Sequence, residues 1–209
     1  MMSYVYRWHS RLTAGTDGPM VGNSLLHLQQ SDLDGACGHH CALMALMLFG
    51  ELTRDDLEGK PKKPLASFWK MALPHYFSGT KPSKLASFFK SYRDAVNIKV
   101  VLKRLPAEIR ATIHADGLAI VGIKNASLDH WMLAVGIGSC EGSREEEQLL
   151  LLDPTFPPLS MVPWNATLSL HPNRRGWHSY TSATGSAKVR LADAVCLLPS
   201  MQEIELNIV

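Results

Sequence analysis

The clearest pattern along the chain is a run of apolar positions that begins at Cys37 and stops at Gly50. The segment reads CGHHCALMALMLF and is apolar on nearly every side from Cys41 onward. A helix that is apolar all round is buried in a core, and glycine is a common residue just past a helix C-terminus. The sequence therefore predicts a buried helix over residues 37–49.

A second helical pattern follows a segment that is rich in charge and proline. Residues 51–84 include KPKKP at 60–64, which indicates short helices joined by exposed loops. After Pro82, the segment LASFFKSYRDA at 85–95 repeats its apolar residues at helical spacing. That spacing predicts an amphipathic helix.

From about residue 96 the pattern changes to short apolar strands, with turn residues between them. Strands and one helix are expected as follows: an edge strand at 4–8, strands at 98–102, 118–123, 131–137, 149–152 and 189–198, and a helix at 106–115. The rest of residues 1–30 is predicted to be irregular, and residues 157–188 are predicted to be loop-like.

Helix-rich sequence followed by strand-rich sequence predicts an α+β fold, in which N-terminal helices pack against a mostly antiparallel C-terminal sheet. The length suits a single domain over residues 1–209. We expect a helical lobe at about 31–95 and a sheet lobe at about 96–209.

Composition and charge narrow the class of protein. Apolar residues make up 46% of the chain and charged residues 19%, which fits neither a disordered chain nor a coiled coil. A net charge of +2 is too small for a nucleic-acid footprint. The uncharged stretch 35–50 is shorter than the roughly 18–20 apolar residues of a membrane span. We therefore expect a globular protein with no nucleic-acid partner and no membrane span.

The N-terminal sequence and the number of cysteines indicate where in the cell the protein is expected to be. Residues 1–11 alternate aromatic and polar residues and lack the features of a secretory signal. We expect a cytoplasmic location, with export by a dedicated secretion system as the alternative. The four cysteines are too few for a disulfide scaffold in this chain and are expected to be free thiols: Cys37, Cys41, Cys140 and Cys196.

Cys37 is a candidate nucleophile because it stands where the buried helix begins. The positive end of the helix dipole and the free N–H groups there favour the thiolate, which is the reactive form of cysteine. The small pair Gly35-Ala36 precedes it. A lone cysteine is more often a small buried hydrophobe, so this interpretation depends on a histidine partner and on a group that orients the histidine.

His130 and Asp153 supply such partners in a predicted hairpin. His130 opens the apolar strand HWMLAVGI, and Asp153 ends the second apolar segment, QLLLLDP. If the strands pair symmetrically about a turn centred between Glu141 and Gly142, His130 faces Asp153. Directly opposed residues of an antiparallel pair point to the same side of the sheet, at hydrogen-bonding reach.

Other assignments use neighbouring residues. Asp129 is a rival to Asp153, but it precedes His130 on the same strand and should point to the other face. His40 could serve as a local base. Cys37, His39, His40 and Cys41 could bind zinc, although no second cluster with ligand spacing follows. A disulfide between Cys37 and Cys41 would need non-helical geometry.

Three motifs together resemble the papain-like peptidases that process double-glycine leaders. DGACGHHCALMALMLFG is similar to their nucleophile helix, and HWMLAVGI and LLLLDP are similar to their His strand and Asp-Pro strand. The resemblance spans residues 29–154. It implies a papain-like fold with Cys37 as nucleophile, His130 as general base and Asp153 as orienting residue.

The family also has a glutamine before the cysteine, whose side-chain amide joins the cysteine N–H in an oxyanion hole. Gln30 is the best match and Gln29 the second. Gln30 lies one residue farther from the cysteine than is usual in the family, and Ala36 stands where an aspartate is common.

These observations predict a cysteine-dependent peptidase or amidase that acts on a peptide or protein substrate and needs no cofactor and no metal. Acyl transfer to a protein side chain, or its deamidation, would use the same residues. A non-catalytic binding protein on the same fold is a further alternative, and so is an effector or toxin delivered into other cells, with no particular partner or inhibitor protein implied.

Overall fold

The structure is a computed structural model that describes residues 4–32, 34–140 and 143–200. Its largest part is a closed antiparallel barrel of six strands, in which each of β6 to β10 pairs with the next and β11 pairs back to β6. The barrel strands are β6 (Leu118–Lys124), β7 (Asp129–Cys140), β8 (Ser143–Leu152), β9 (Ala166–Ser169), β10 (His178–Ser182) and β11 (Gly185–Pro199).

Side chains that alternate along the barrel strands form two separate cores. In β6, Ala119 and Val121 belong to a cluster that draws residues from all six barrel strands, as expected for a barrel interior. Leu118 and Ile120, on the other face, pack in a cluster with the buried helix at Cys37. Because both faces of this strand are buried, it reads as a nearly continuous apolar run rather than as an alternating one.

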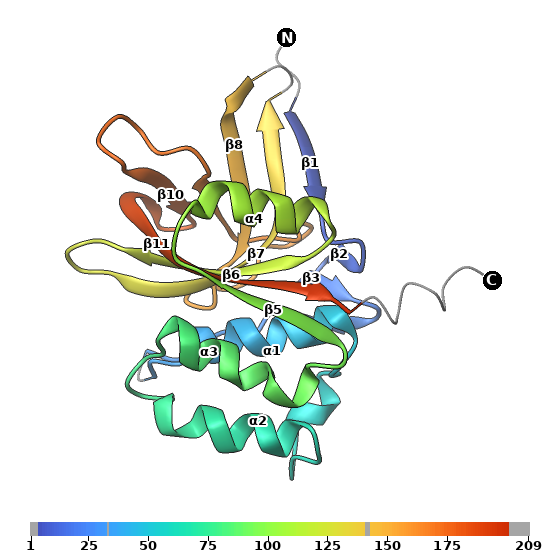
Figure 1. Cartoon of the computed structure of the whole chain (residues 1–209). Helices are drawn as coiled ribbons and strands as arrows, with labels where there is room; N and C mark the ends of the chain where they lie inside the picture. Colours follow the sequence, from blue (N-terminus) through green and yellow to red (C-terminus); the bar gives the residue numbers. More distant parts are fainter. Residues whose placement is uncertain (1–3, 33, 141–142, 201–209) are drawn as a thin grey trace.

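Three helices lie together on one side of the barrel, and a fourth lies across it (Figure 1). The four are α1 (Cys37–Phe49), α2 (Leu65–Ala72), α3 (Pro82–Phe88) and α4 (Leu105–His114). Short 3₁₀ helices occur at Asp55–Leu57, Leu73–His75 and Phe89–Tyr92. The helix α1 packs mainly against β7, which brings Cys37 to the strand that carries His130.

The helices predicted at 37–49 and 106–115 are confirmed, the second with bounds shifted by one residue. The helix α1 ends as predicted, because Gly50 adopts the left-handed conformation with φ 85°. The helix predicted at 85–95 is divided in the structure: α3 already starts at Pro82, and a 3₁₀ turn replaces the α-helix from Phe89.

Among the described residues, five further strands lie outside the barrel. The predicted edge strand is confirmed as β1 (Tyr4–Trp8), which pairs with β7. The segment predicted to be irregular also contains a small antiparallel sheet of β2 (Leu12–Gly15), β3 (Gly18–Val21) and β4 (Ser24–Leu25). The strand predicted at 98–102 is β5 (Val96–Val101), which pairs with β11.

The predicted papain-like α+β fold is wrong. The structure is mostly β and only 25% helical, and its strands close into a barrel instead of forming a sheet behind a helical lobe. The segments responsible are β9 and β10, which lie in the region 157–188 that was predicted to be loop. The strand β9 pairs with both β8 and β10, and β10 pairs with β11, so these two short strands close the ring.

The physical reason for the error is the length of the two strands. They have four and five residues, and sequence rich in proline and polar residues flanks them, so little periodicity marks them. Their stability comes from pairing, and the pairing of β9 with β8 joins segments that a long connection separates in the chain.

Candidate active site

The turn before α1 fixes the position of Cys37. Asp34 Oδ2 accepts hydrogen bonds from the N–H and the hydroxyl of Ser31, each at 2.9 Å, and Asp34 Oδ1 accepts one from the Ala36 N–H at 3.0 Å. Burial acts to raise the pKa of Asp34, but these bonds outweigh it and lower the pKa. The carboxylate therefore holds the chain in a defined bend where the helix begins.

The backbone N–H of Cys37 is available to a ligand. The first N–H groups of a helix have no intrahelical acceptor, and the Cys37 N–H donates to no acceptor in the part of the chain that the structure describes. The side chain itself is only 7% exposed. Cys37 therefore presents a partly shielded sulfur beside a free backbone donor.

His130, on β7, lies between Cys37 and Asp153. Its Nε2 is 2.8 Å from Asp153 Oδ1, and the Cys37 side chain is near enough to the ring to contribute to raising the pKa of His130. Because Nε2 bonds to the carboxylate, Nδ1 is the nitrogen that remains for the sulfur. The three residues predicted from sequence are thus brought together in the order sulfur, imidazole, carboxylate.

The charges of this group follow from its contacts. Burial disfavours the charged imidazole, but the hydrogen bonds to Asp153 and Cys37 outweigh it and raise the pKa of His130 to about 10. Burial likewise acts to raise the pKa of Asp153, whereas hydrogen bonds from His130 and Tyr180 lower it. Near neutral pH the group contains an imidazolium and a carboxylate, and a neighbouring imidazolium stabilises a thiolate.

The predicted hairpin register is wrong near the site, although the contact it was meant to explain is present. Leu133 pairs with Leu152 and Ala134 with Leu151, so continuing this register would place Thr155 opposite His130. The shift arises from irregularities between Ala134 and Gly136 and between Gly138 and Cys140.

A shift of two residues keeps a side chain on the same face, whereas a shift of one would turn it away. Asp153 therefore reaches His130 as a diagonal neighbour beyond the end of β8. The predicted centre of the turn, between Glu141 and Gly142, lies outside the described residues.

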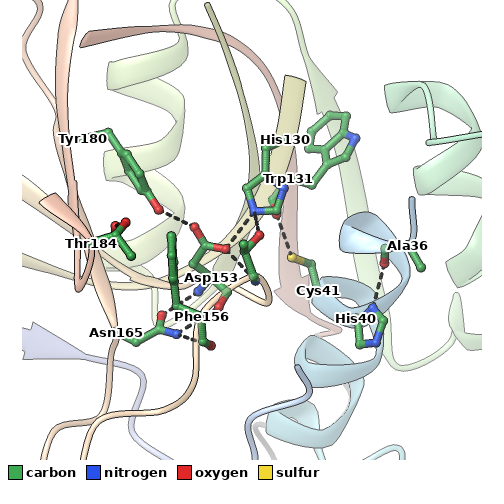
Figure 2. A network of polar contacts seen from close by, with 12 residues as sticks. Ala36, His40, Cys41, His130, Trp131, Asp153, Phe156, Asn165, Tyr180 and Thr184 are labelled. Atoms are coloured by element: carbon green, nitrogen blue, oxygen red, sulfur yellow. Dashed lines mark hydrogen bonds and ion pairs between the residues drawn. The ribbon is translucent and has the colours of Figure 1, made fainter. Parts of the chain in front are cut away.

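Three residues that sequence reasoning missed form hydrogen bonds with Asp153, and two of them, Tyr180 and Asn165, are labelled in Figure 2. Tyr180 donates from its hydroxyl to Oδ2 at 2.5 Å, and the Thr155 N–H donates to Oδ1 at 2.8 Å. Asn165 accepts from the Asp153 N–H at 2.7 Å and donates to the Asp153 carbonyl at 2.9 Å. The available signal for Tyr180 was the alternation of buried and exposed positions in HSYTS.

A cleft of about 840 Å³ opens beside Cys37 and His130, and Gln30 lines it. The Gln30 N–H donates to the Pro154 carbonyl at 2.8 Å, which ties this residue to the segment that carries Asp153. Its side-chain oxygen is buried without a partner, and its side-chain nitrogen makes no hydrogen bond to any described residue. Gln29, the second candidate, is exposed and lines a different hollow.

The alternative site residues make other contacts. Asp129 is exposed at the rim of the cleft and pairs with Lys124 at 3.3 Å. His40 is bonded through Nδ1 to the Ala36 carbonyl at 2.9 Å and lines the same hollow as Gln29. Neither residue contacts the sulfur–imidazole–carboxylate group among the interactions of the described residues.

Cys41 and its neighbours do not form a metal site. Its thiol donates to the Trp131 carbonyl at 3.5 Å, and burial raises its pKa well above the usual value. None of the four cysteines, which all lie in the described part of the chain, forms a disulfide. Within residues 4–32, 34–140 and 143–200, no group of three or more His, Cys, Asp or Glu is arranged to hold a metal ion.

No protein-family model matches the chain, and no curated protein matches its sequence significantly. The resemblance to leader-processing peptidases therefore depends on the three motifs quoted above. A separate property concerns membranes: in the part of the chain that the structure describes, every helix is too short or too polar to cross a bilayer.

Proposed function

We propose that this protein is a cysteine-dependent peptidase or amidase that cleaves its substrate through an acyl-enzyme. The observation that carries the proposal is the contact of His130 with both Cys37 and Asp153 at the edge of the cleft. A nucleophilic cysteine needs a base and a group that orients the base. The cleft volume of about 840 Å³ is in the range of sites that enclose a ligand, and we expect a peptide or protein substrate.

In the first half of the reaction the Cys37 thiolate attacks the carbonyl carbon of the scissile bond. The electron pair of the C=O bond moves to the oxygen, which becomes an oxyanion. When the tetrahedral intermediate collapses, His130 Nδ1 gives its proton to the leaving amine and the C–N bond breaks. A thioester to Cys37 remains, and His130 is neutral.

In the second half, neutral His130 removes a proton from water, whose oxygen attacks the thioester carbon. Collapse of this second intermediate breaks the C–S bond, releases the acid product and returns the thiolate–imidazolium pair. Asp153 keeps the imidazole in one orientation throughout and stabilises its charged form.

The oxyanion is assigned to two donors, the Cys37 N–H and the side-chain amide nitrogen of Gln30. Both groups are without protein acceptors in the described part of the chain, and both border the cleft. Donors that are already in place stabilise charge that develops only in the transition state. The motif resemblance supports this assignment of roles, whereas the fold that it implied is not the one observed.

Alkylation with iodoacetamide followed by peptide mapping tests the proposal. We expect selective modification of Cys37 at mildly acidic pH, and loss of that selectivity in His130→Ala. His114→Ala is the matched control, because His114 is exposed at the end of α4. Equal modification of all four cysteines, only above about pH 8 as for ordinary thiols, would contradict the proposal.

Mass spectrometry of peptides incubated with the protein and with Cys37→Ala identifies the reaction. Cleaved peptides that depend on Cys37 are expected. Products that are deamidated or joined to an amine, without cleavage, would instead assign the same residues to deamidation or acyl transfer.

A further inference from the structure

The segment Tyr76–Thr80 lies along the cleft and is attached to both catalytic segments. The Gly35 N–H, near Cys37 in the chain, donates to the Tyr76 carbonyl at 3.1 Å. Trp131 Nε1, next to His130 in the chain, donates to the Thr80 carbonyl at 2.8 Å. The two ends of the segment are therefore held at defined positions relative to the nucleophile and the base.

Glycine at position 35 lets this segment approach the start of α1. A Cβ atom there would lie 2.9 Å from the Phe77 carbonyl oxygen and 3.1 Å from the Gly79 nitrogen, which is closer than a side chain tolerates. Gly79 itself has φ 75°, in the left-handed region that favours glycine. The backbone of Tyr76–Thr80, which we call the cleft wall, thus packs against the backbone just before α1.

Phe77 is the exposed apolar residue of the cleft wall. Its side chain is 78% exposed, the largest value among the large hydrophobic residues that the structure describes. Phe77 is among the residues that line the cleft, and its ring has an edge contact with Tyr76 at a centroid distance of 5.2 Å. A single exposed aromatic ring is ordinary on a protein surface, but this one belongs to the cleft that Cys37 also lines, on a segment with both ends hydrogen-bonded.

The charged side chains of the cleft do not favour a substrate of either charge. Three lysines and three aspartates line the cleft, so neither sign of charge is favoured overall. Trp131 also lines the cleft, but it is only 6% exposed, and its ring packs where a Cβ at Gly122 would lie only 3.1 Å away. Phe77 is therefore the exposed aromatic side chain of this cleft, within a lining of balanced charge.

We propose that Phe77 is a specificity residue, which contacts an apolar or aromatic side chain of the peptide substrate close to the scissile bond. This inference rests on the proposed peptidase activity. Binding such a side chain removes both it and the Phe77 ring from water, and the hydrophobic effect favours that burial.

The test measures kcat/KM on a peptide library in which the residues around the cleaved bond are varied. Phe77→Ala should lower kcat/KM about tenfold or more for peptides with Phe, Leu or Met at the preferred position, mainly through KM, and should change little for peptides with Ala or Ser there. Phe77→Leu should keep the preference. Leu73→Ala is the matched control, because Leu73 is 58% exposed and is not part of the cleft lining.

Alkylation of Cys37 by iodoacetamide separates the two proposals, because this small reagent does not need the Phe77 ring. We expect equal rates for the wild type and Phe77→Ala. If Cys37 is selectively alkylated and peptides are cleaved, but Phe77→Ala and Leu73→Ala have the same peptide preference as the wild type, the specificity proposal is overturned and the peptidase proposal stands. If Cys37 is not selectively alkylated and no peptide is cleaved, both fail.

Discussion

Tyr180 donates a 2.5 Å hydrogen bond to Asp153 Oδ2, while His130 bonds to the other oxygen of the same carboxylate. Tyr180 is on β10 and Asp153 follows β8, so closure of the barrel brings them together. Burial and the neighbouring carboxylate raise the pKa of Tyr180 far above its usual range, so the phenol remains a donor. The carboxylate that orients His130 is thus held on both of its oxygens.

Replacing Tyr180 by Phe removes one donor from a buried carboxylate. We expect the pKa of Asp153 to rise, because this bond is among the interactions that lower it. The free energy of unfolding should fall by about 1.5–3 kcal/mol, as is typical for a hydrogen bond to a charged group. Urea unfolding and the acid limb of the activity profile measure the two effects.

Tyr92→Phe is the control for that measurement. The Tyr92 hydroxyl is buried without a hydrogen-bond partner among the described residues, so its removal should cost little stability. Equal destabilisation in the two variants would mean that the Tyr180 bond contributes nothing specific.

Asp153→Asn should move the alkaline limit of activity to lower pH. In the wild type, burial opposes the charged ring, but Asp153 and Cys37 raise the pKa of His130 to about 10. Without the carboxylate charge the effect of burial remains, so the pKa falls and the imidazolium that protonates the leaving amine is lost earlier as the pH rises.

The same variant should lose about 10⁴-fold in kcat at its optimum, in line with loss of the orienting aspartate in serine-protease triads. The pH profile of acylation and the ¹⁵N chemical shifts of His130 measure both changes. An alkaline limb at the wild-type position in Asp153→Asn would contradict this account of the charge on His130.

Gln30→Ala should lower kcat by about 10²- to 10³-fold, the usual cost of losing one oxyanion donor. KM should change little, because the oxyanion exists only in the transition state and in the intermediate. Gln29→Ala is a matched control on the neighbouring exposed residue and should leave kcat unchanged. A larger effect in Gln29→Ala than in Gln30→Ala would reverse the assignment.

Asn165→Ala should destabilise the fold as well as the site. The Asn165 side chain is buried. It accepts a hydrogen bond from the Asp153 N–H and donates one to the Asp153 carbonyl, and it also donates to the carbonyls of Phe156 and Pro157. Each buried group left unpaired costs about 1–3 kcal/mol, so we expect a loss of at least about 3 kcal/mol in urea unfolding. Asn97→Ala, at an exposed position of β5, should have almost no effect.

Local patterns were sufficient for the elements that carry the three central residues. The apolar run and the glycine after it correctly placed both ends of α1, and hence Cys37 at the helix start. The apolar strand after His130 was also present, as β7. The predicted contact between His130 and Asp153 is present although the predicted β7–β8 register was wrong. The error in register was two residues, and a two-residue shift keeps the side chain on the same face.

The sequence by itself determined where α1 begins and that an apolar strand follows His130, and so which sulfur, imidazole and carboxylate are available. Only the tertiary structure decided that the strands close into a barrel, that Tyr180 and Asn165 surround Asp153, and that Gln30 lines the cleft while Gln29 does not. The physical reason is that periodicity records which face of one element is buried. Barrel closure and the contacts around Asp153 depend instead on pairing between segments far apart in the chain, which leaves no local pattern.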